Sequence, residues 1–495
     1  MIIVGTYPDL DGPTESGSML QQLRQAVDKL LPSDVIVHLL PPYPASGDGG
    51  FAANDWFSTR PALGCWHDLV EWAATRKLIL DGIYNHVGFG HPWITEFFAA
   101  PREDGPIYAY RLSSPPSAQL SPRGGSVFRK YTIEGDDWYV WQTFSNVSFD
   151  IRLSLHHVQA EIRRHLSLLA TSGIYGVRLD GCAYYGHDLS VEQFHNPSAR
   201  LLAHSLAQEA QNHGLFVLAQ LDIDPSGASY FPKAEGWSVP AVDYAYSAVL
   251  VLALLSESAS AMEIHVRRTL GLPCNFIRPP RTHDGILLQS DMLTSRELAD
   301  LAKLCDHWKL PVRMVDGERY EINSSLPFIC SLGVDKPTTW QRILLVVALT
   351  GFLPGIPYFY LPFILCDIPE SRGLTLGADP RSLNRTRLIG AYVKEFSQLK
   401  RSEELHALLC AINSTRALYS DKEFKAHVFS SDVPDSVFAV TRGADCCLFA
   451  CNLSSSRIAK VQLPKKMRLE WGSRATSHTL GPLGFGVWTA SQTNG

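Results

Sequence analysis

Residues 174–181 read IYGVRLDG, and this stretch decides how the chain folds. It is an apolar run of strand length that ends in two charged residues, Arg178 and Asp180. Seven similar runs are separated by helix-length segments: IIVGTY (2–7), DVIVHLLP (34–41), KLILDGIYNH (77–86), LFVLAQLD (215–222), AVDYAYS (241–247), CNFIRPPRTHD (274–284) and IPYFYL (356–361). Nearly continuous apolar runs are typical of parallel strands buried on both faces. The pattern predicts an α/β fold, a (β/α)₈ barrel, although a doubly wound sheet fits it as well.

Two insertions interrupt this alternation, and the C-terminal part departs from it. The first insertion is rich in Pro, Gly and aromatic residues, and each insertion begins at the carboxyl end of a predicted strand. The last part carries short alternating runs, which predict an all-β domain. We expect a barrel of residues 1–87, 154–284 and 336–408, an inserted domain B of residues 88–153, a second insertion, domain B′, of residues 285–335, and a C-terminal antiparallel β-sandwich of residues 409–495.

Composition and charge narrow the class of partner. The chain has 495 residues, of which 45% are hydrophobic and 19% charged, and its net charge is −5, with no basic run and no acidic tail. We therefore expect neither nucleic acid nor a membrane as partner. The ten cysteines lack the spacing of a metal motif, so we expect them to be reduced in the cytoplasm. The N-terminus enters a strand at once and does not read as a signal peptide.

An uncharged stretch, residues 343–366, is long enough to span a bilayer. Pro354, Pro357 and Pro362 interrupt it. Because proline breaks a helix interior, we expect a buried helix, a turn and a buried strand instead of a membrane span.

Polar residues gather where the apolar runs end. The run at 77–86 carries Asp81 and ends in Asn85 and His86, and the run at 274–284 ends in His283 and Asp284. Barrel enzymes build their active sites at the carboxyl ends of the strands, so these positions favour catalysis or binding. Asp81 alone is better explained as a structural carboxylate.

Arg178 and Asp180 are two residues apart on one strand, so both side chains point to the same face. There the arginine can lower the pKa of Asp180 and keep it ionised, as a carboxylate nucleophile requires. A buried structural ion pair is the alternative interpretation.

As a set, the motifs resemble a known family. LILDGIYNH, GVRLDG, VLAQLD and RTHDGI follow the order of the four conserved regions of glycoside hydrolase family 13, the α-amylase clan, and THDGI resembles its sucrose phosphorylase branch. Further segments resemble functional loops of that branch, over about residues 1–395: SGDGGF with Asp48 and Phe51, VWQTFSNVSFDI with Phe144, RYEINS with Tyr320, and ADPRSLNR with Arg381.

The resemblance implies retaining α-glucosyl transfer between a small α-glucoside and phosphate or another small acceptor. Asp180 would form a β-glucosyl ester beside Arg178, and Asp284 would stabilise the transition state. The other implied residues are Asp48, Phe51, His86, Phe144, His283 and Arg381 around the glucose, and Arg123 and Tyr320 on the phosphate or acceptor side. We expect no cofactor and no metal, and a homodimer is left open.

One catalytic position departs from the family. Gln220 stands where the family carries the glutamate that acts as general acid and base. An amide cannot transfer a proton, and such catalysis contributes about 10²–10⁴-fold. Three interpretations stay open: an engineered Glu-to-Gln change, a natural enzyme whose donor or acceptor is anionic and needs no proton transfer, or a sugar-binding protein without turnover.

A second departure lies two residues further on. Asp222 replaces a histidine that the sucrose phosphorylases carry near phosphate, and a carboxylate there would repel phosphate. Asp222 shares a strand face with Gln220 and is either a displaced acid or an acceptor-binding carboxylate. Arg319 and Glu321 flank Tyr320 and make the predicted acceptor loop more charged than a fructose site needs.

Overall fold

The structure is a computed structural model of the 495-residue chain. It describes residues 1–490 apart from residues 12–16, 117–120, 123, 188, 190–193, 195, 222–238, 271, 273–274, 289–292, 316, 373–380, 386, 420–423, 427–433, 444, 462 and 464–466.

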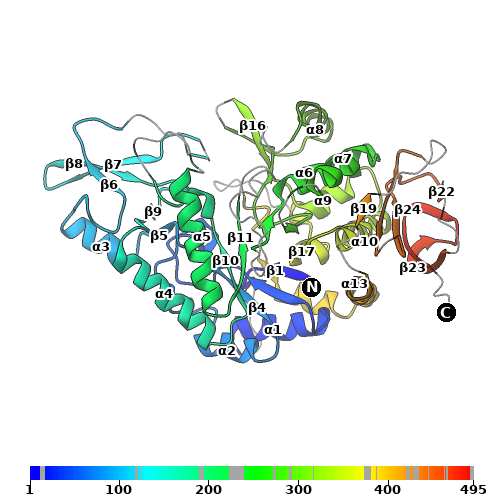
Figure 1. The fold of residues 1–495 in the computed structure, drawn as a ribbon, viewed down its shortest axis with the longest axis horizontal. Helices are drawn as coiled ribbons and strands as arrows, with labels where there is room; N and C mark the ends of the chain where they lie inside the picture. The colour runs from blue at the N-terminus through cyan, green and yellow to red at the C-terminus, as the bar shows by residue number, and fades with distance from the viewer. Residues whose placement is uncertain are drawn as a thin grey trace.

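Eight parallel strands form a closed barrel at the centre of the molecule (Figure 1). They follow one another around the barrel in chain order, and the last strand pairs with the first. Each of the eight apolar runs supplies one strand, so the predicted barrel is confirmed and the doubly wound sheet is wrong. The strands are β1 (Ile3–Thr6), β3 (Ile36–Leu39), β4 (Leu78–Gly82), β10 (Gly176–Leu179), β11 (Phe216–Ala219), β12 (Ala241–Val242), β13 (Phe276–Arg278) and β17 (Ile356–Tyr360).

Helices cover the outside of the barrel because their apolar residues recur at helical spacing. Helix α1 shows the pattern: Leu20, Leu23, Val27 and Leu30 are buried, and Ser18 begins the helix with a capping box. The other helices of this layer are α2 (Trp66–Ala73), α4 (His156–Thr171), α5 (Pro197–Asn212), α6 (Tyr244–Ser256), α7 (Ser260–Leu270), α10 (Lys336–Phe352), α11 (Leu361–Ile364), α12 (Gly390–Phe396) and α13 (Lys400–Leu418), and α1 itself spans Met19–Leu30.

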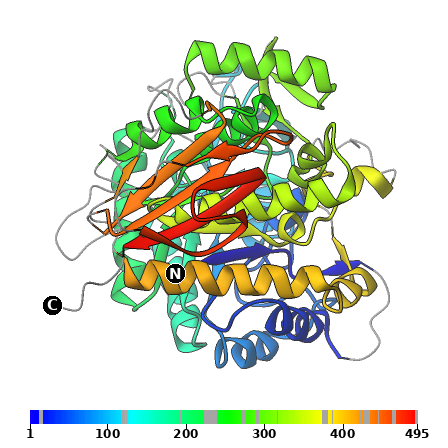
Figure 2. The same ribbon diagram turned by 90° about the vertical axis from the view of Figure 1, so that its right-hand side faces the viewer.

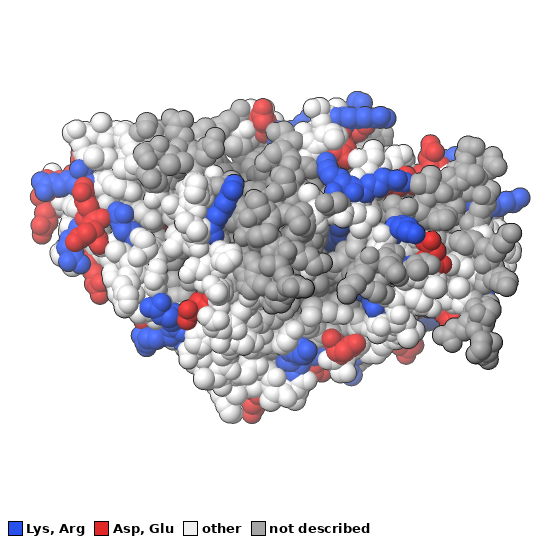
Figure 3. All heavy atoms as spheres, viewed as in Figure 1, with Lys and Arg blue, Asp and Glu red and all other residues white. Residues whose placement is uncertain are grey.

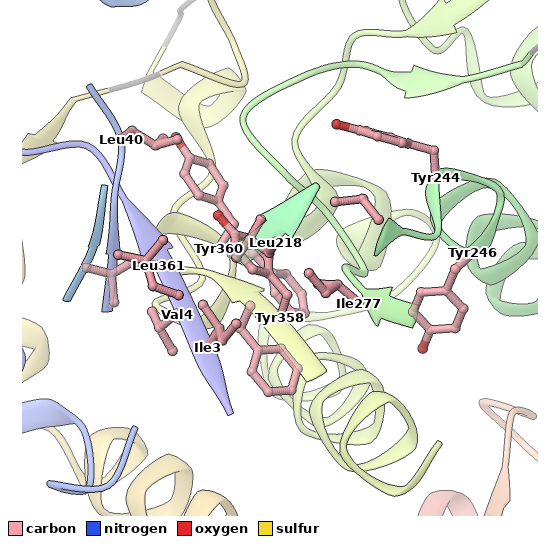
Figure 4. Close-up of a cluster of buried hydrophobic side chains, with 14 of the residues drawn as sticks. Ile3, Val4, Leu40, Leu218, Tyr244, Tyr246, Ile277, Tyr358, Tyr360 and Leu361 are labelled. Atoms are coloured by element: carbon pink, nitrogen blue, oxygen red, sulfur yellow. The ribbon is translucent and has the colours of Figure 1, made fainter. Parts of the chain in front are cut away.

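Side chains from several barrel strands gather in a single apolar cluster (Figure 4). Ile3 and Val4 of β1, Leu218 of β11 and Ile277 of β13 are at most 1% exposed. Strands buried on both faces have no polar side to show, which explains why the runs in the sequence are continuous rather than alternating.

The uncharged stretch folds as the sequence predicts. It comprises most of helix α10, then strand β17, then the short helix α11. Within the part of the chain that the structure describes, no helix is long and apolar enough to cross a membrane. Helix α10 is buried on all sides from Thr339 to Phe352 because it lies between the barrel and the C-terminal sheet.

The two inserted segments rise from the same end of the barrel (Figure 1). The first holds α3 (Pro92–Ala99), a three-stranded sheet of β6 (Ala109–Arg111), β7 (Phe128–Ile133) and β8 (Asp136–Trp141), and the pair β5 (His86–Gly88) and β9 (Ser148–Asp150). The second holds α8 (Ser295–Trp308), α9 (Leu326–Ser331) and the sheet of β14 (Ile286–Leu287), β15 (Val312–Val315) and β16 (Glu318–Ile322). We keep residues 88–153 and 285–335 as proposed domain limits.

The C-terminal domain differs from the expectation in two respects. Residue 409, its predicted start, lies inside helix α13, since residues 400–418 contain no helix breaker. The described strands form one antiparallel sheet rather than a sandwich, and in Figure 2 this sheet lies directly above α13. The strands are β19 (Lys425–Ala426), β20 (Val437–Arg442), β21 (Cys447–Asn452), β22 (Ala459–Lys460), β23 (Met467–Ala475) and β24 (Thr479–Ala490).

Helix α10 packs against the C-terminal sheet, on the side where a sandwich would have its second sheet. Phe352 at its end stacks on Phe449 of β21, with ring centroids 4.8 Å apart and an interplanar angle of 4°. Buried Arg442 donates to the carbonyl oxygens of Phe352 (3.0 Å) and Leu353 (2.9 Å), which have no further helical partner. The sheet therefore buries its apolar face against the barrel layer.

Candidate active site

A cavity of about 560 Å³, open to solvent, lies at the carboxyl ends of the barrel strands. Thirteen residues were expected to act in catalysis or binding, and ten of them line the cavity: Asp48, Phe51, His86, Phe144, Asp180, Gln220, His283, Asp284, Tyr320 and Arg381. Five other residues complete the wall: Pro122, Gly181, Tyr244, Leu287 and Arg385. The structure thus brings together residues from the segments that follow seven of the barrel strands, including both insertions.

Arg178 lies behind this wall and joins three side chains. Strand register places it opposite Asp81 of β4, and its Nη1 donates to Asp81 and to Asp180 Oδ1, the latter at 2.9 Å. Its Nη2 donates to Gln220 Oε1. Asp81 is fully buried and also accepts from His38 Nε2 at 3.2 Å. The register of two neighbouring strands therefore fixes where Asp180 can stand.

The pKa of Asp180 differs from the sequence-based expectation. Burial raises it above its ordinary value, and the attraction of Arg178 only partly opposes that effect, while Asp81 and Asp284 add to the rise. Arg178 does lower the pKa of Asp180, as expected, but this effect is smaller than the effect of burial. A buried carboxylate near two other carboxylates binds protons more tightly than an exposed one.

Asp284 is held in the opposite state. Burial alone would raise its pKa, but the positive charges of His283 (when this ring is protonated), Arg381 and Arg385 outweigh burial and keep the pKa well below its usual range. Burial also lowers the pKa of His283 to about 3, so this histidine is neutral near pH 7 and the two arginines carry the charge. Arg381 Nη1 donates to Asp284 Oδ1 at 2.5 Å.

Arg385 is a site residue that the sequence reasoning missed. Its Nη1 donates to Asp48 Oδ1 at 2.7 Å, and its Nη2 reaches Asp284 Oδ1 at 3.4 Å. It belongs to the same ADPRSLNR segment as Arg381, so the motif that pointed to Arg381 could also have pointed to Arg385. Only the fold reveals that both arginines turn toward one carboxylate.

Aromatic rings form the remaining walls. Phe51 stacks on His283, with ring centroids 4.9 Å apart and an interplanar angle of 7°. His86 Nε2 lies 3.0 Å from the Phe51 carbonyl oxygen, and the His86 ring lies 5.3 Å from that of Phe144. Tyr244 stands at the start of α6 beside the strand ends (Figure 4). Flat apolar faces beside carboxylates and guanidinium groups suit a sugar ring, whose edges are polar and whose faces are not.

The charges of the predicted acceptor loop do not serve an acceptor. Arg319 donates to both carboxylate oxygens of Asp306 on α8, at 2.9 and 3.0 Å. Glu321 is fully buried and accepts from Arg381 Nη2 at 3.1 Å. Both charges are therefore neutralised within the protein, and only Tyr320 between them lines the cavity.

Two expected residues, Arg123 and Asp222, lie outside the described residues. Among the residues that are described, no group of three His, Cys, Asp or Glu side chains is arranged to hold a metal ion. On the face drawn in Figure 3, acidic and basic side chains are interspersed, and neither sign forms a continuous field.

No protein-family model matches the chain. Curated relatives do: the sucrose 6(F)-phosphate phosphorylase of Thermoanaerobacterium thermosaccharolyticum is 22% identical over 77% of this chain and 80% of its own length. The glucosylglycerate phosphorylase of Allomeiothermus silvanus is 29% identical over 72% of this chain and 67% of its own length. The sucrose phosphorylase of Bifidobacterium adolescentis is 26% identical over 80% and 81%.

Solved structures share the fold. A crystal structure of sucrose 6F-phosphate phosphorylase from Thermoanaerobacter thermosaccharolyticum superposes with a TM-score of 0.77 and 19% identity over 91% of this chain and 94% of that one. Isomaltulose synthase from Klebsiella sp. LX3 gives a TM-score of 0.70 and 13% identity over 99% and 98%. The chain is a distant homologue of sucrose and glucosylglycerate phosphorylases, and it is an enzyme that shares its fold with the sucrose 6F-phosphate phosphorylase structure.

Proposed function

We propose that the chain catalyses retaining α-glucosyl transfer through a β-glucosyl ester on Asp180. The observation that carries the proposal is that Asp180 and Asp284 line one cavity in different environments. Asp284 is held ionised by two arginines, and Asp180 is held in place by Arg178 at 2.9 Å. A carboxylate that attacks C1 and a second one that stays charged are what a retaining mechanism uses.

The donor is a small α-glucoside and the acceptor is phosphate or another small molecule. The relatives support this class, since the three described above are phosphorylases of glucosides. Asp48, Phe51, His86, Phe144, His283, Arg381 and Arg385 would hold the glucose, and Tyr320 would stand on the acceptor side. We also propose a cytoplasmic location, in keeping with the free cysteines among the described residues.

A sugar-binding protein without turnover is the competing function. Such a protein has no use for a nucleophile held at a fixed place, yet Asp180 keeps its bond from Arg178 and its place in the cavity wall. That pair favours the enzyme.

The test uses α-glucosyl fluoride as donor and inorganic phosphate as acceptor. Proton NMR of the fresh product should show α-glucose 1-phosphate, because two inversions at C1 restore the original configuration. Asp180→Asn should give no product and serves as the control for contaminating activity. A β-configured product, or binding of glucose without any turnover by either protein, would refute the proposal.

A further inference from the structure

A second cavity lies beside the active site. Its volume is about 250 Å³, less than half that of the active-site cavity, and it is partly open to solvent, so a small ligand can enter it. The two cavities have no lining residue in common, yet they share two segments of the chain. Residues 281–282 and 383–384 line the second cavity, whereas residues 283–284, Arg381 and Arg385 line the first. The second cavity is therefore a separate space.

Arg281 brings a buried guanidinium with unused donors to the wall of this cavity. The residue is 3% exposed, and its Nε and Nη2 have no hydrogen-bond partner among the described residues. Burial lowers the pKa of Arg281 to about 10, because the attraction of Glu321 and Asp284 offsets only part of the cost of burial. A buried charge without hydrogen bonds is costly, so these donors point to a ligand that accepts them.

Two further buried groups on the same cavity lack a partner in the part of the chain that the structure describes. They are Tyr360 Oη, at the end of β17 (Figure 4), and Asn384 Oδ1. Neighbouring bonds fix the orientation of the Asn384 amide. Its Nδ2 donates to Asn323 Oδ1 at 3.3 Å, and Asn323 Nδ2 donates to Glu321 Oε1 at 3.2 Å. Because an ionised carboxylate only accepts, this chain of bonds leaves Asn384 Oδ1 as an acceptor.

The free donors of Arg281 define the shape of a ligand, and the other walls limit its charge. Nε and Nη2 present two parallel N–H groups on one edge of the guanidinium, which match two oxygens on a single carbon. Asp367 lines the same cavity, and the carboxylate of Glu370 is occupied by the backbone N–H and hydroxyl of Ser325. A singly charged planar anion therefore suits the cavity better than a phosphate dianion, which Asp367 would repel more strongly.

We propose that the second cavity binds a small planar monoanion of the carboxylate type, and that bicarbonate fits it best. Two oxygens of the anion would accept from Arg281 Nε and Nη2. Tyr360 Oη would donate to one of them, and the hydroxyl group of bicarbonate would donate to Asn384 Oδ1. Formate has the same pair of oxygens but no hydroxyl group, so it leaves the Asn384 acceptor without a partner. The site takes no part in glucosyl transfer, and the proposal does not rest on the proposed function.

The test is urea unfolding of the full chain in sodium HEPES buffer at a slightly alkaline pH, where bicarbonate persists and Arg281 stays charged. Sodium formate or sodium bicarbonate replaces the bulky buffer salt at constant ionic strength. A ligand that binds only the folded protein lowers the unfolding equilibrium constant in proportion to its concentration once this exceeds Kd. Each further tenfold rise in formate should thus lower that constant about tenfold, and bicarbonate should act at lower concentrations than formate.

Four variants locate the effect. Arg281→Met should respond to neither anion, and without an anion it should be more stable than the parent, because the buried charge is gone. Asn384→Ala should remove the advantage of bicarbonate over formate. Tyr360→Phe should weaken formate binding about tenfold through one lost bond to a charged group, and it decides the matter if Arg281→Met does not fold. Arg296→Met is the matched control, since that side chain is 93% exposed, and it should respond as the parent does.

An equal response of the parent and Arg281→Met would overturn the proposal, because the anions would then act on the protein surface in general. A parent that responds to neither anion would overturn it as well, and would mean that water alone satisfies these buried groups. Chloride that stabilises the parent as strongly as formate would refute the planar class of ligand. None of these outcomes bears on the proposed function, since unfolding is measured without a sugar.

Discussion

Replacing Glu321 with glutamine should destabilise the protein, although nothing in its sequence context suggests a structural role. Glu321 is fully buried on β16 of the second insertion. Both of its carboxylate oxygens accept hydrogen bonds from Arg381, Oε2 from Nη2 at 3.1 Å and Oε1 from Nε at 3.4 Å. Asn323 Nδ2 adds a third bond at 3.2 Å. In Glu321→Gln one of the two oxygens becomes an NH₂ group, so at least one donor loses its acceptor inside the protein.

The size of the effect follows from burial. Removing one partner of a buried ion pair costs about 3–5 kcal/mol, and we expect about 3 kcal/mol here because the amide keeps one acceptor. The free energy of unfolding should be measured in urea. Glu318→Gln is the matched control, since Glu318 lies on the same strand and is exposed, and it should stay within about 0.5 kcal/mol of the parent.

The effect should also depend on pH. Burial alone would raise the pKa of Glu321, but Arg381 outweighs it and holds the pKa below the ordinary value of 4.5. A lowered pKa in the folded state stabilises the protein above the unfolded-state pKa, and this contribution is lost as the pH falls through the folded-state pKa. The difference between parent and Glu321→Gln should thus be full at pH 7 and shrink below about pH 4. Equal stability of Glu321→Gln and Glu318→Gln at pH 7 would refute the reasoning.

Three further predictions concern the site and its surroundings. Burial raises the pKa of Asp180 above 3.8, and the nucleophile must be ionised to react. The value of kcat/KM for α-glucosyl fluoride should therefore fall at low pH, with a midpoint above 3.8. A pH profile that is flat down to pH 3.8 would contradict this prediction. Arg385→Gln should lower kcat/KM about 10–100-fold through the lost charged bonds to Asp48 and Asp284, and an unchanged value would remove Arg385 from the site. Arg281 Nε and Nη2 are buried with no hydrogen-bond partner among the described residues. Arg281→Met should therefore raise the free energy of unfolding, measured in urea, by about 1 kcal/mol. A lower free energy of unfolding in this variant would show that the charge of Arg281 is stabilising.

Much of the fold could be predicted because strands buried on both faces leave a plain trace in the sequence. The continuous runs located all eight barrel strands. The run at 241–247 shows the limit of such reasoning, since only Ala241 and Val242 form a strand and helix α6 begins at Tyr244, with Asp243 as its N-cap. Apolar composition does not distinguish a buried strand from the first turn of a buried helix.

The site was predicted in part for a similar reason. Residues at strand ends meet at one rim whatever the details of packing, so Asp180, His86 and Asp284 could be placed from the strand pattern alone. Pairing between distant segments leaves no local trace. The sequence did not show that Glu321 turns to Arg381 rather than to an acceptor, because that pair joins an inserted lobe to a loop 60 residues further on.

A covalent glucosyl ester on Asp180 can be located directly in the protein. The protein should be trapped with 5-fluoro-α-glucosyl fluoride, digested with pepsin and analysed by tandem mass spectrometry. We expect one fluoroglucosyl unit on Asp180, within the peptide that contains residues 176–181, and no label in Asp180→Asn. A label on Asp284 or elsewhere, or an unlabelled protein that still consumes the fluoride, would contradict it.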